Sequence, residues 1–364
     1  MICIKYGQEL TKENVEGVNV YRIPLKRKRS GKIRYFWEYS SFLFLSFILL
    51  SYLHLRNKYD IIHVHNMPEF LVYSAIIPKI TGSKIILDMH DPTPEIFITK
   101  YNIDTTDFLY RFLVYMEKKS IKFSHLVFTP NIAFYKLFIK RGCPESKIHI
   151  IMNSPDEKIF NIHSEQPIEL QKSNKDFIVM YHGFIAERNG LDSALKAISD
   201  IKNKIPGLVF NVYGDGDFTD RFLEIIDELN IKDVVNYYGI VPLEKIAEAI
   251  ESIDLGIIPN KLTPFTEINF PTRIFEYLSK YKPVIAPKTT GILDYFNDES
   301  IFFFKPGDAK DLSEKIMEIY NNPSHVQKVI KRGKIIHDEH SWEKESQHLV
   351  QLVEKLLQTF NKNN

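Results

Sequence analysis

The stretch FIVMYHGFIAERNGLD, residues 177–192, contains the unit from which most of this chain is built. It begins with a continuous apolar run at 177–181, turns at Gly183, and leads into an amphipathic segment at 192–205. An apolar run without polar alternation is typical of a strand that is covered on both faces, as in a parallel sheet. The stretch therefore predicts a strand, a glycine turn and a helix, in the order of a βαβ unit.

The same alternation recurs on both sides of this stretch. Further apolar runs of strand length lie at 1–5, 61–65, 84–88, 126–129, 148–152, 208–213, 255–259 and 283–286. Amphipathic segments lie at 220–229, 243–253 and 311–320, and a last one begins at Ser341. The alternation stops at 161–176, which is polar and has no clear period, so we interpret 163–176 as a linker. The sequence predicts two parallel α/β domains, 1–162 and 177–340, with the segment from Ser341 free to pack on either.

Length and composition agree with this prediction and exclude several protein classes. A chain of 364 residues, 44% apolar and 26% charged, suggests two globular domains and excludes a disordered or fibrous protein. Its 47 basic and 46 acidic residues give a net charge of +1, which argues against a nucleic-acid partner. Two cysteines, Cys3 and Cys143, exclude a disulfide framework and a cysteine-rich metal site, and favour a reducing compartment.

The segment 40–55 (SSFLFLSFILLSYLHL) is the most apolar part of the chain. It is shorter than the ~20 apolar residues that span a bilayer, and no secretory signal opens the chain. The preceding stretch, 26–34 (KRKRSGKIR), holds six cations and no acid. Two interpretations stay open: a buried helix after a solvated loop, or a basic, apolar element at 26–55 that lies on an anionic membrane surface. A transmembrane span is the less favoured third.

Polar and glycine residues follow the predicted strands of the second domain, where ligands bind in open α/β sheets. Gly183 lets the backbone approach a ligand, and Arg188 adds a positive charge that suits a diphosphate. The alternative is a glycine turn with a solvated arginine. Gly214 ends the next strand, and a further turn can place backbone groups beside a planar base. That turn contains Tyr238, Gly239 and Ile240.

The segment 267–278 (EINFPTRIFEYL) carries the strongest signal in this half. Its apolar residues can face the core, which leaves Arg273 and Glu276 one turn apart on another face. A carboxylate at that position can accept two ribose hydroxyls, and Arg273 at a helix start can meet phosphate. The alternative is a plain i,i+3 ion pair between the two side chains, worth only ~0.2–0.5 kcal/mol.

In the first domain, polar residues also gather at strand ends. The strand at 84–88 runs into His90, Asp91 and Glu95, with prolines between them. The strand before it ends in two histidines followed by an asparagine: His63, His65 and Asn66. A histidine–aspartate pair at such a place is either structural or chemical. The spacing matches no zinc motif, and no Ser or Cys lies in a nucleophile elbow.

Taken in order, these motifs resemble the family-4 glycosyltransferases of the GT-B architecture, especially members that build bacterial cell-surface polysaccharides. The resemblance covers nearly the whole chain. It rests on YDIIHVHNMPEF (59–70), KIILDMHDPTPE (84–95), NSPD (153–156), YHGFIAERNGLD (181–192), VYGDGD (212–217), YYGIVP (237–242) and FPTRIFEYLSKYKPVIA (270–286).

The resemblance implies two Rossmann-like, doubly wound domains that face each other across a cleft, with 341–364 returning to the first. It implies a nucleotide-sugar donor on the second domain and a saccharide or lipid-linked acceptor on the first. Transfer is expected to retain the anomeric configuration without an essential metal or a cofactor. A cytoplasmic protein, peripheral on the inner face of the membrane, is the matching expectation.

Carried over by position, the resemblance also implies roles for single residues. Glu276 accepts the ribose hydroxyls, Arg188 neutralises the leaving diphosphate, and His90 contacts the donor sugar. Further donor contacts are expected from Gly183, Gly214, Tyr238, Gly239, Ile240, Asn269 and Arg273. The acceptor side is expected to include His65, Asn66, Asp91 and Glu95.

Three features depart from the family pattern. The position eight residues before Glu276, usually acidic, is Ile268, so either Glu267 or Asn269 is expected to serve the sugar, with Glu267 counted among the catalytic residues. Phe184 replaces a common arginine, and Arg273 is expected to supply that charge. One βα unit is missing before 1–5, which suggests a shortened start. Two alternatives to a transferase therefore stay open: a catalytically silent nucleotide-sugar-binding subunit and a GT-B nucleotide-sugar epimerase.

Overall fold

The structure, a computed structural model, describes residues 1–25, 32–160 and 176–361. It divides into two compact units. The first unit comprises Met1–Pro130, Tyr135–Ile150 and Val350–Asn364, and the second comprises Asn131–Phe134 and Ile151–Leu349. Of the predicted linker, 163–176, only Asp176 belongs to the described residues. Each unit is considered below by itself.

The second unit is built on a six-stranded parallel sheet with the order β10-β9-β8-β11-β12-β13. Numbered from β8 along the chain, this is the order 3-2-1-4-5-6 of a doubly wound Rossmann sheet. The direction of winding reverses between β8 and β11, which makes the carboxyl ends of these strands the expected ligand site. The strands are β8 (Phe177–His182), β9 (Leu208–Tyr213), β10 (Val235–Tyr237), β11 (Leu255–Ile257), β12 (Val284–Pro287) and β13 (Phe302–Phe304).

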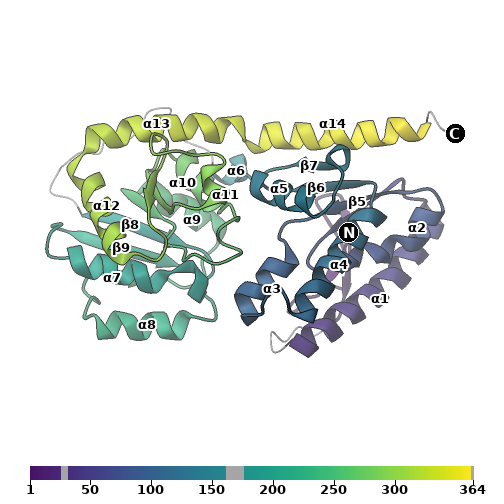
Figure 1. Ribbon diagram of the computed structural model, residues 1–364, viewed down its shortest axis with the longest axis horizontal. Helices are drawn as coiled ribbons and strands as arrows, with labels where there is room; N and C mark the ends of the chain where they lie inside the picture. Colours follow the sequence, from purple (N-terminus) through teal and green to yellow (C-terminus); the bar gives the residue numbers. More distant parts are fainter. Residues whose placement is uncertain (26–31, 161–175, 362–364) are drawn as a thin grey trace. The chain divides into compact units, whose positions relative to one another are not determined.

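Helices bury both faces of this sheet, as the apolar runs predict. Val179 and Tyr181 of β8 belong to one core with α7, α8 and α12, whereas Met180, between them, belongs to a second core with α9 and α10. Figure 1 shows α7 and α8 on one side of β8 and β9, and α9 and α10 on the other. The helices of this unit are α6 (Glu157–Phe160), α7 (Leu191–Ile201), α8 (Thr219–Glu228), α9 (Leu243–Glu251), α10 (Arg273–Ser279), α11 (Thr290–Leu293), α12 (Ala309–Asn321) and α13 (Pro323–Glu339).

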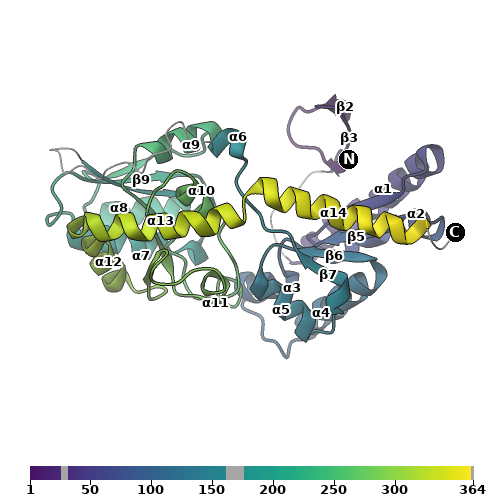
Figure 2. The same ribbon diagram turned by 90° about the horizontal axis from the view of Figure 1, so that it is seen from above.

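The first unit contains a four-stranded parallel sheet with the order β4-β5-β6-β7. A separate three-stranded sheet, β1-β3-β2, is formed by the beginning of the chain, and Figure 2 shows β2 and β3 apart from the larger sheet. The strands are β1 (Ile2–Ile4), β2 (Lys12–Val15), β3 (Val18–Ile23), β4 (Ile61–His65), β5 (Lys84–Asp88), β6 (Leu126–Thr129) and β7 (Ile148–Ile150). The helices are α1 (Lys32–Asn57), η1 (Glu69–Ala75), α2 (Ile76–Ile80), α3 (Thr93–Tyr101), α4 (Phe108–Phe123) and α5 (Ile132–Lys140), while α14 (Trp342–Asn361) runs from the second unit into the first.

The apolar segment 40–55 lies within α1, and only one side of this helix is buried. Leu53 and His54 are 7% and 4% exposed, whereas Phe44 and Leu55 are 63% and 67% exposed. By length and composition, Trp37–Asn57 is the one segment among the described residues that could cross a membrane. The interpretation as a fully buried helix is therefore wrong for the outer side of α1. Most of the cationic stretch before it, 26–31, lies outside the described residues.

Candidate functional site

In the second unit, two strand ends meet at glycines. Gly214, which follows β9, has a φ of +123°, and a Cβ built on it would lie 1.9 Å from the carbonyl oxygen of Gly183. Only glycine fits a left-handed backbone this close to another chain segment. Gly183 in turn donates its N–H to the carbonyl of Tyr213 over 3.0 Å. The predicted glycine turns after β8 and β9 are thus packed against each other.

Helix α10 directs two charged side chains to the end of β8. The carboxylate of Glu276 is hydrogen-bonded to Nε2 of His182, the last residue of β8. Nη1 of Arg273 donates to the carbonyl of His182 over 2.7 Å, and its guanidinium lies 4.6 Å from the centre of the Tyr181 ring. The i,i+3 spacing predicted that these two side chains share a face. Both Arg273 and Glu276 contact His182 on β8, so the alternative of an isolated ion pair between the two side chains does not describe them.

His182 connects Glu276 to the core and was not among the predicted site residues. Its Nδ1 lies 3.0 Å from the hydroxyl of Tyr277, and that hydroxyl donates to the carbonyl of Met180 over 3.0 Å. Burial raises the pKa of Tyr277 well above its ordinary value, which keeps the phenol protonated. Because its proton goes to Met180, the hydroxyl can accept a hydrogen bond from His182 Nδ1. The sequence did contain a signal for His182, because this histidine directly precedes Gly183 at the end of a predicted strand.

Arg188 lies in η3 (Glu187–Asn189), on the loop that follows β8. Its guanidinium is 5.8 Å from the centre of the Phe265 ring, and its carbonyl accepts from the N–H of Lys261 over 2.9 Å. Gly190 fixes this loop, because its φ is +68° and a Cβ there would lie 1.9 Å from the carbonyl oxygen of Pro259. The contacts of Arg188 therefore run to the 259–265 segment, while those of Glu276 run to His182.

The two candidates for the missing acidic position lie beside the start of α11. The carboxylate of Glu267 accepts from the backbone N–H of Thr290 over 3.3 Å and from its hydroxyl. The backbone of Asn269 packs on Gly291, where a Cβ would come within 2.5 Å of its carbonyl oxygen. The side chain of Glu267 is thus held by α11, and the roles of both residues stay predictions.

The turn predicted to lie beside a base adjoins Gly214. Tyr238 stacks on Tyr213 with ring centres 4.5 Å apart and planes 8° apart. The N–H of Gly214 donates to the carbonyl of Gly239 over 2.7 Å, and Ile240 is 78% exposed. The stacked tyrosine pair is a flat apolar surface next to the glycine turn. The sequence analysis selected Tyr238 of this pair but not Tyr213.

In the first unit, three of the four predicted acceptor-side residues, His65, Asn66 and Asp91, lie with His90 at the carboxyl ends of β4 and β5. Nδ1 of His65 lies 2.7 Å from Nε2 of His90. The amide of Asn66 donates to the carbonyl of Asp91 over 2.6 Å and accepts from the N–H of His90 over 2.9 Å. Asn66 therefore holds the loop that carries His90. These three predicted residues are brought together, with Asp91 at the same loop.

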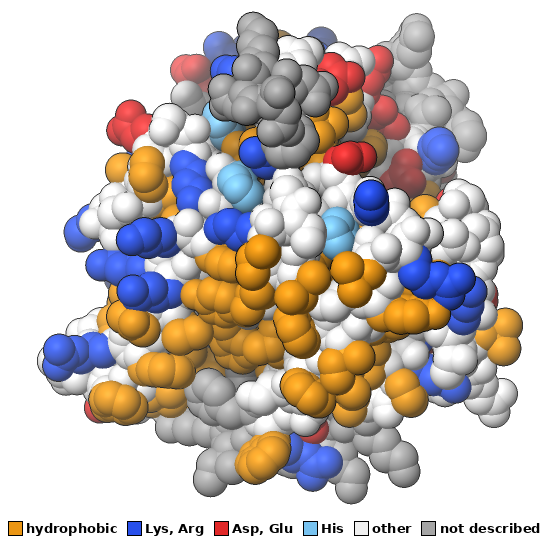
Figure 3. Space-filling view, turned by 90° about the vertical axis from the view of Figure 1, so that its right-hand side faces the viewer, with side chains coloured by type: hydrophobic (Ala, Val, Ile, Leu, Met, Phe, Trp, Pro, Cys, Tyr) orange, Lys and Arg blue, Asp and Glu red, His pale blue; other side chains and the backbone are white. Residues whose placement is uncertain are grey.

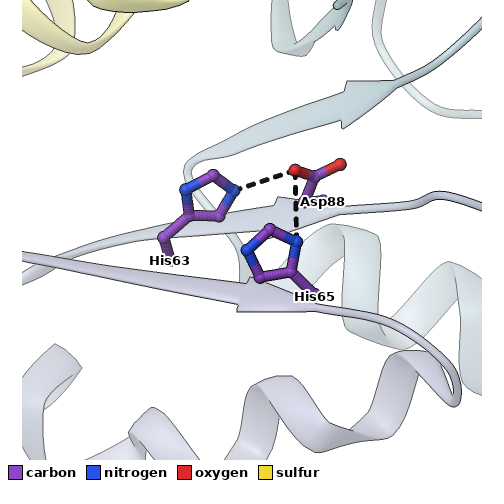
Figure 4. Close-up of side chains that lie close together, drawn as sticks. All are labelled: His63, His65 and Asp88. Carbon is purple, nitrogen blue, oxygen red and sulfur yellow. Dashed lines mark hydrogen bonds and ion pairs between the residues drawn. The ribbon is translucent and has the colours of Figure 1, made fainter. Parts of the chain in front are cut away.

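Two residues outside the predicted set complete this cluster. Nε2 of His63 and Nδ1 of His65 face the same oxygen of Asp88, at 3.1 Å and 3.4 Å (Figure 4). Burial opposes ionisation of Asp88, but the hydrogen bond from His63 and the nearby imidazoles hold its pKa below the ordinary value. Asp88 is therefore a carboxylate at neutral pH.

Glu95, predicted on the acceptor side, is buried in an ion cluster. Arg141 contacts both Glu95 and Glu117, the latter over 2.8 Å, and donates to the hydroxyl of Tyr110 over 2.8 Å. Burial, with the charges of Glu69 and Glu95 nearby, raises the pKa of Glu117 to about 8. One carboxyl of the cluster is thus neutral at pH 7 and Arg141 is paired with the other. This gives Glu95 a structural partner, and its acceptor role stays a prediction.

Each part of the chain matches the model of a known family. Residues 4–158 match the family described as Glycosyltransferase Family 4, and residues 163–335 match the family described as Glycosyl transferases group 1. Together the two matches span most of the chain, from residue 4 to residue 335.

Individual relatives are distant but span much of the chain. A 2-deoxystreptamine N-acetyl-D-glucosaminyltransferase of Niallia circulans is 23% identical over 85% of this chain and 79% of its own length. An Escherichia coli K12 protein, provisionally named a colanic acid biosynthesis glycosyltransferase, is 22% identical over 55% of this chain, and the match spans only 49% of that relative.

Solved structures share the architecture. Sucrose-phosphate synthase of Thermosynechococcus elongatus has a TM-score of 0.76 at 17% identity, over 99% of this chain and 89% of its own. The Anabaena protein HepE in complex with UDP-glucose has a TM-score of 0.70 at 15% identity, over 93% and 86%. With the two parallel sheets described above, these similarities confirm the expected GT-B fold.

Proposed function

We propose that this chain, which belongs to the group 1 glycosyltransferases of family 4, transfers a sugar from a nucleotide-sugar donor to a saccharide or lipid-linked acceptor in cell-surface polysaccharide synthesis. The complex of HepE with UDP-glucose supports a nucleoside diphosphate sugar as the donor. The provisional name of the E. coli relative supports polysaccharide synthesis. We further propose that transfer retains the anomeric configuration and needs no metal.

One observation carries the proposal: Glu276, Arg273 and His182 converge at the carboxyl end of β8, at the switch point of the second sheet. The Glu276 carboxylate, held by His182, has the chemistry to accept two ribose hydroxyls. Breaking the bond between sugar and phosphate leaves negative charge on the departing nucleotide. Guanidinium groups held beside the phosphates would stabilise that charge without rearrangement, and we propose Arg273 and Arg188 for this role.

Donor binding by the second unit is the first test. The purified chain is screened by thermal unfolding against UDP-glucose and other nucleoside diphosphate sugars, since a bound ligand raises the apparent stability. We expect one class of donor to raise the midpoint. Glu276→Gln and Arg188→Ala should each lose the rise, while Glu248→Gln, an exposed carboxylate on α9, should retain it.

Turnover is measured on the same variants with the donor that binds, with and without a membrane fraction as the source of acceptor. Each site substitution should lower the rate by about 100- to 1000-fold, equivalent to ~2.7–4 kcal/mol. A donor that binds without being consumed would favour the silent subunit, and isomerisation of the donor alone would favour the epimerase. The proposed site is wrong if binding and turnover survive both Glu276→Gln and Arg188→Ala.

We also propose that α1 docks the first unit on an anionic membrane, where a lipid-linked acceptor would lie. Its outer side carries a helical stripe of exposed apolar residues: Trp37, Phe44, Ile48, Tyr52 and Leu55. Figure 3 looks onto the side of the molecule where α1 and α2 lie, and shows a continuous band of hydrophobic side chains with Lys and Arg on both flanks. An apolar stripe between cations suits the interface of an anionic leaflet.

Cosedimentation with vesicles tests the docking. Binding should increase with the content of anionic lipid and fall with salt, because the cations act through screened charge. The double substitution Phe44→Glu/Ile48→Glu should abolish it. Ile335→Glu, which changes a residue on α13 that is 60% exposed, is the matched control and should leave binding unchanged. Equal binding by neutral and anionic vesicles, or by the double variant, would contradict the proposal.

A further inference from the structure

Four side chains of the first unit stand on one face of two neighbouring strands. His63 and His65 belong to β4, Asp88 ends β5, and His90 follows two residues later. His65 and Asp88 are direct partners in the parallel ladder. Since residues two apart on a strand point to the same face, this register places His63, His65 and Asp88 together, and the turn after β5 brings His90 beside His65. Figure 4 shows three of them turned toward one another.

The distances between their donor atoms are those of a metal site. Nε2 of His63 and Nδ1 of His65 lie 3.1 Å and 3.4 Å from Oδ2 of Asp88. Nε2 of His90 lies 3.8 Å from Oδ1 of Asp88 and 2.7 Å from Nδ1 of His65. Around a tetrahedral zinc ion, with bonds of about 2.0–2.1 Å, ligand atoms are about 3.3–3.4 Å apart. The donor atoms of His63, His65 and Asp88 all lie within 4.8 Å of one another, and His90, beside His65, is the fourth candidate ligand.

The type of donor atom selects the ion. Three imidazole nitrogens and one carboxylate oxygen are ligands that zinc prefers, whereas magnesium and calcium prefer oxygen. The facing ring nitrogens of His65 and His90 are 2.7 Å apart, which adds a second pair of nitrogen donors to the group.

The surroundings hold the group in place and leave it accessible. The rings of His63 and His65 are stacked with centres 4.5 Å apart, and those of His65 and His90 with centres 5.0 Å apart. Asn66 fixes the backbone of His90 through the hydrogen bond described above. The side chains of His65 and His90 are 57% and 38% exposed, so that an ion can reach them from solvent.

We propose that His63, His65, Asp88 and His90 bind a zinc ion, and that the bound ion inhibits sugar transfer because it removes His90 from the donor sugar. The binding of zinc stands by itself, whereas the inhibition rests on the proposed function and on the donor contact that the family resemblance implies for His90. A transferase that needs no metal for its chemistry would thus be regulated by one.

Binding is measured first, on the full chain without a histidine tag and after treatment with a chelator. Calorimetric titration should show one zinc ion per chain, with no heat from Mg²⁺, and Co²⁺ should give the visible absorption of a tetrahedral site. His63→Ala and Asp88→Asn should each weaken binding by about 10- to 100-fold or more. His348→Ala, which removes an exposed histidine of α14, is the matched control and should bind as the parent does.

Several outcomes would overturn the site. Absence of saturable zinc binding would do so, as would binding that His63→Ala leaves intact. Equal losses in His63→Ala and His348→Ala would indicate adsorption to scattered surface histidines instead. Circular dichroism and thermal unfolding of each variant show that a loss of binding is not a loss of the fold.

Inhibition is measured on the donor turnover assay. Zinc should lower the rate and EDTA should restore it. His63→Ala changes a residue with no assigned part in transfer, so it should keep its basal rate and resist zinc. Equal inhibition of the parent and His63→Ala would refute the regulatory role. If no donor is consumed at all, the proposed function fails, but the titration still decides whether the zinc site exists.

Discussion

The two units use the same parallel architecture but place their polar groups differently. In the second unit, the strands of a six-stranded sheet are buried by apolar helices on both faces, and its charged site residues lie at the carboxyl edge. In the first unit, charges also lie inside: Glu69 is 2% exposed, Glu95 is 7% and Glu117 is fully buried, with Arg141 among them. The second unit also buries Lys280 and Lys282, which are 6% and 5% exposed, but Lys280 pairs with Glu251, whose side chain is 46% exposed. The difference is therefore one between a mostly apolar interior and an interior that holds a cluster of paired charges.

This difference has a physical consequence for each unit. Apolar packing contributes stability that hardly changes with pH, because it involves no titration. A buried charge is stable only while its partner and its proton are in place. We therefore expect substitutions and pH to separate the two units, and hydrogen exchange of β5 and β9 reports on each unit separately.

The largest effect is expected at Arg141. Arg141→Met keeps the volume but leaves the carboxylate of Glu95 buried without its partner, which should destabilise the first unit by ~3–5 kcal/mol. Exchange in β5 should accelerate accordingly, while exchange in β9 should change little. Adding Glu95→Gln and Glu117→Gln removes the unpaired charge and should restore most of the lost stability.

Arg221 is the matched control for that prediction. It pairs with Glu224 and Glu228 on the surface of α8, where its side chain is 47% exposed. Surface ion pairs contribute about 0–1 kcal/mol, so Arg221→Met should have a small effect. Similar losses from Arg141→Met and Arg221→Met would refute the idea that the interior of the first unit depends on charge.

A smaller effect, limited to the second unit, is expected at Gly190. In Gly190→Ala, the alanine must adopt the left-handed backbone of Gly190, which destabilises the fold by ~1–2 kcal/mol. Its Cβ also collides with the carbonyl oxygen of Pro259. Gly239→Ala, with a φ of +66° and nothing within 4 Å of the new Cβ, should show the backbone cost alone. Chemical denaturation of both variants gives the difference. Equal midpoints would show that the 183–190 loop moves away from the 259–265 segment without cost.

For a change of one pH unit, the smallest effect is the pH dependence of the first unit. Burial raises the pKa of Glu117 to about 8, so the folded state keeps a proton that the unfolded chain loses near pH 4.5. Stability from this group is complete below that pH and decreases as pH rises toward 8, by at most ~1.4 kcal/mol per pH unit. Glu117→Gln should make hydrogen exchange in β5 depend less on pH, once the exchange rates are corrected for the pH dependence of intrinsic exchange. An unchanged slope would place the proton elsewhere.

Much of the fold follows from local pattern alone. The apolar runs at 61–65, 84–88, 126–129 and 208–213 are strands with the predicted bounds, because a strand covered on both faces needs a continuous apolar sequence. The sequence analysis did not select β2, β3, β10 and β13. β10 and β13 have three residues each, too few for a periodic signal, and β2 and β3 contain polar residues; each of the four is defined by its pairing with a neighbour.

The site was predictable in its residue types but not in its contacts. Arg273 and Glu276 were expected together from their spacing. The residue that both contact is His182, through its backbone carbonyl and its ring respectively. His63 and Asp88 lie 25 positions apart, so no sequence motif connects them, and only the register of β4 on β5 does. Glu95 was selected for its place on a loop, and only burial beside Arg141 reveals its ion cluster.

By itself, the order of apolar runs and glycine turns determined that this chain forms parallel α/β domains with polar groups at the strand ends, because those features depend on residues close in sequence. The choice of partner for each charged side chain was decided by the tertiary structure. Hydrogen bonds and ion pairs act over a few ångströms, and strand register and burial bring residues that are far apart in the chain within that range.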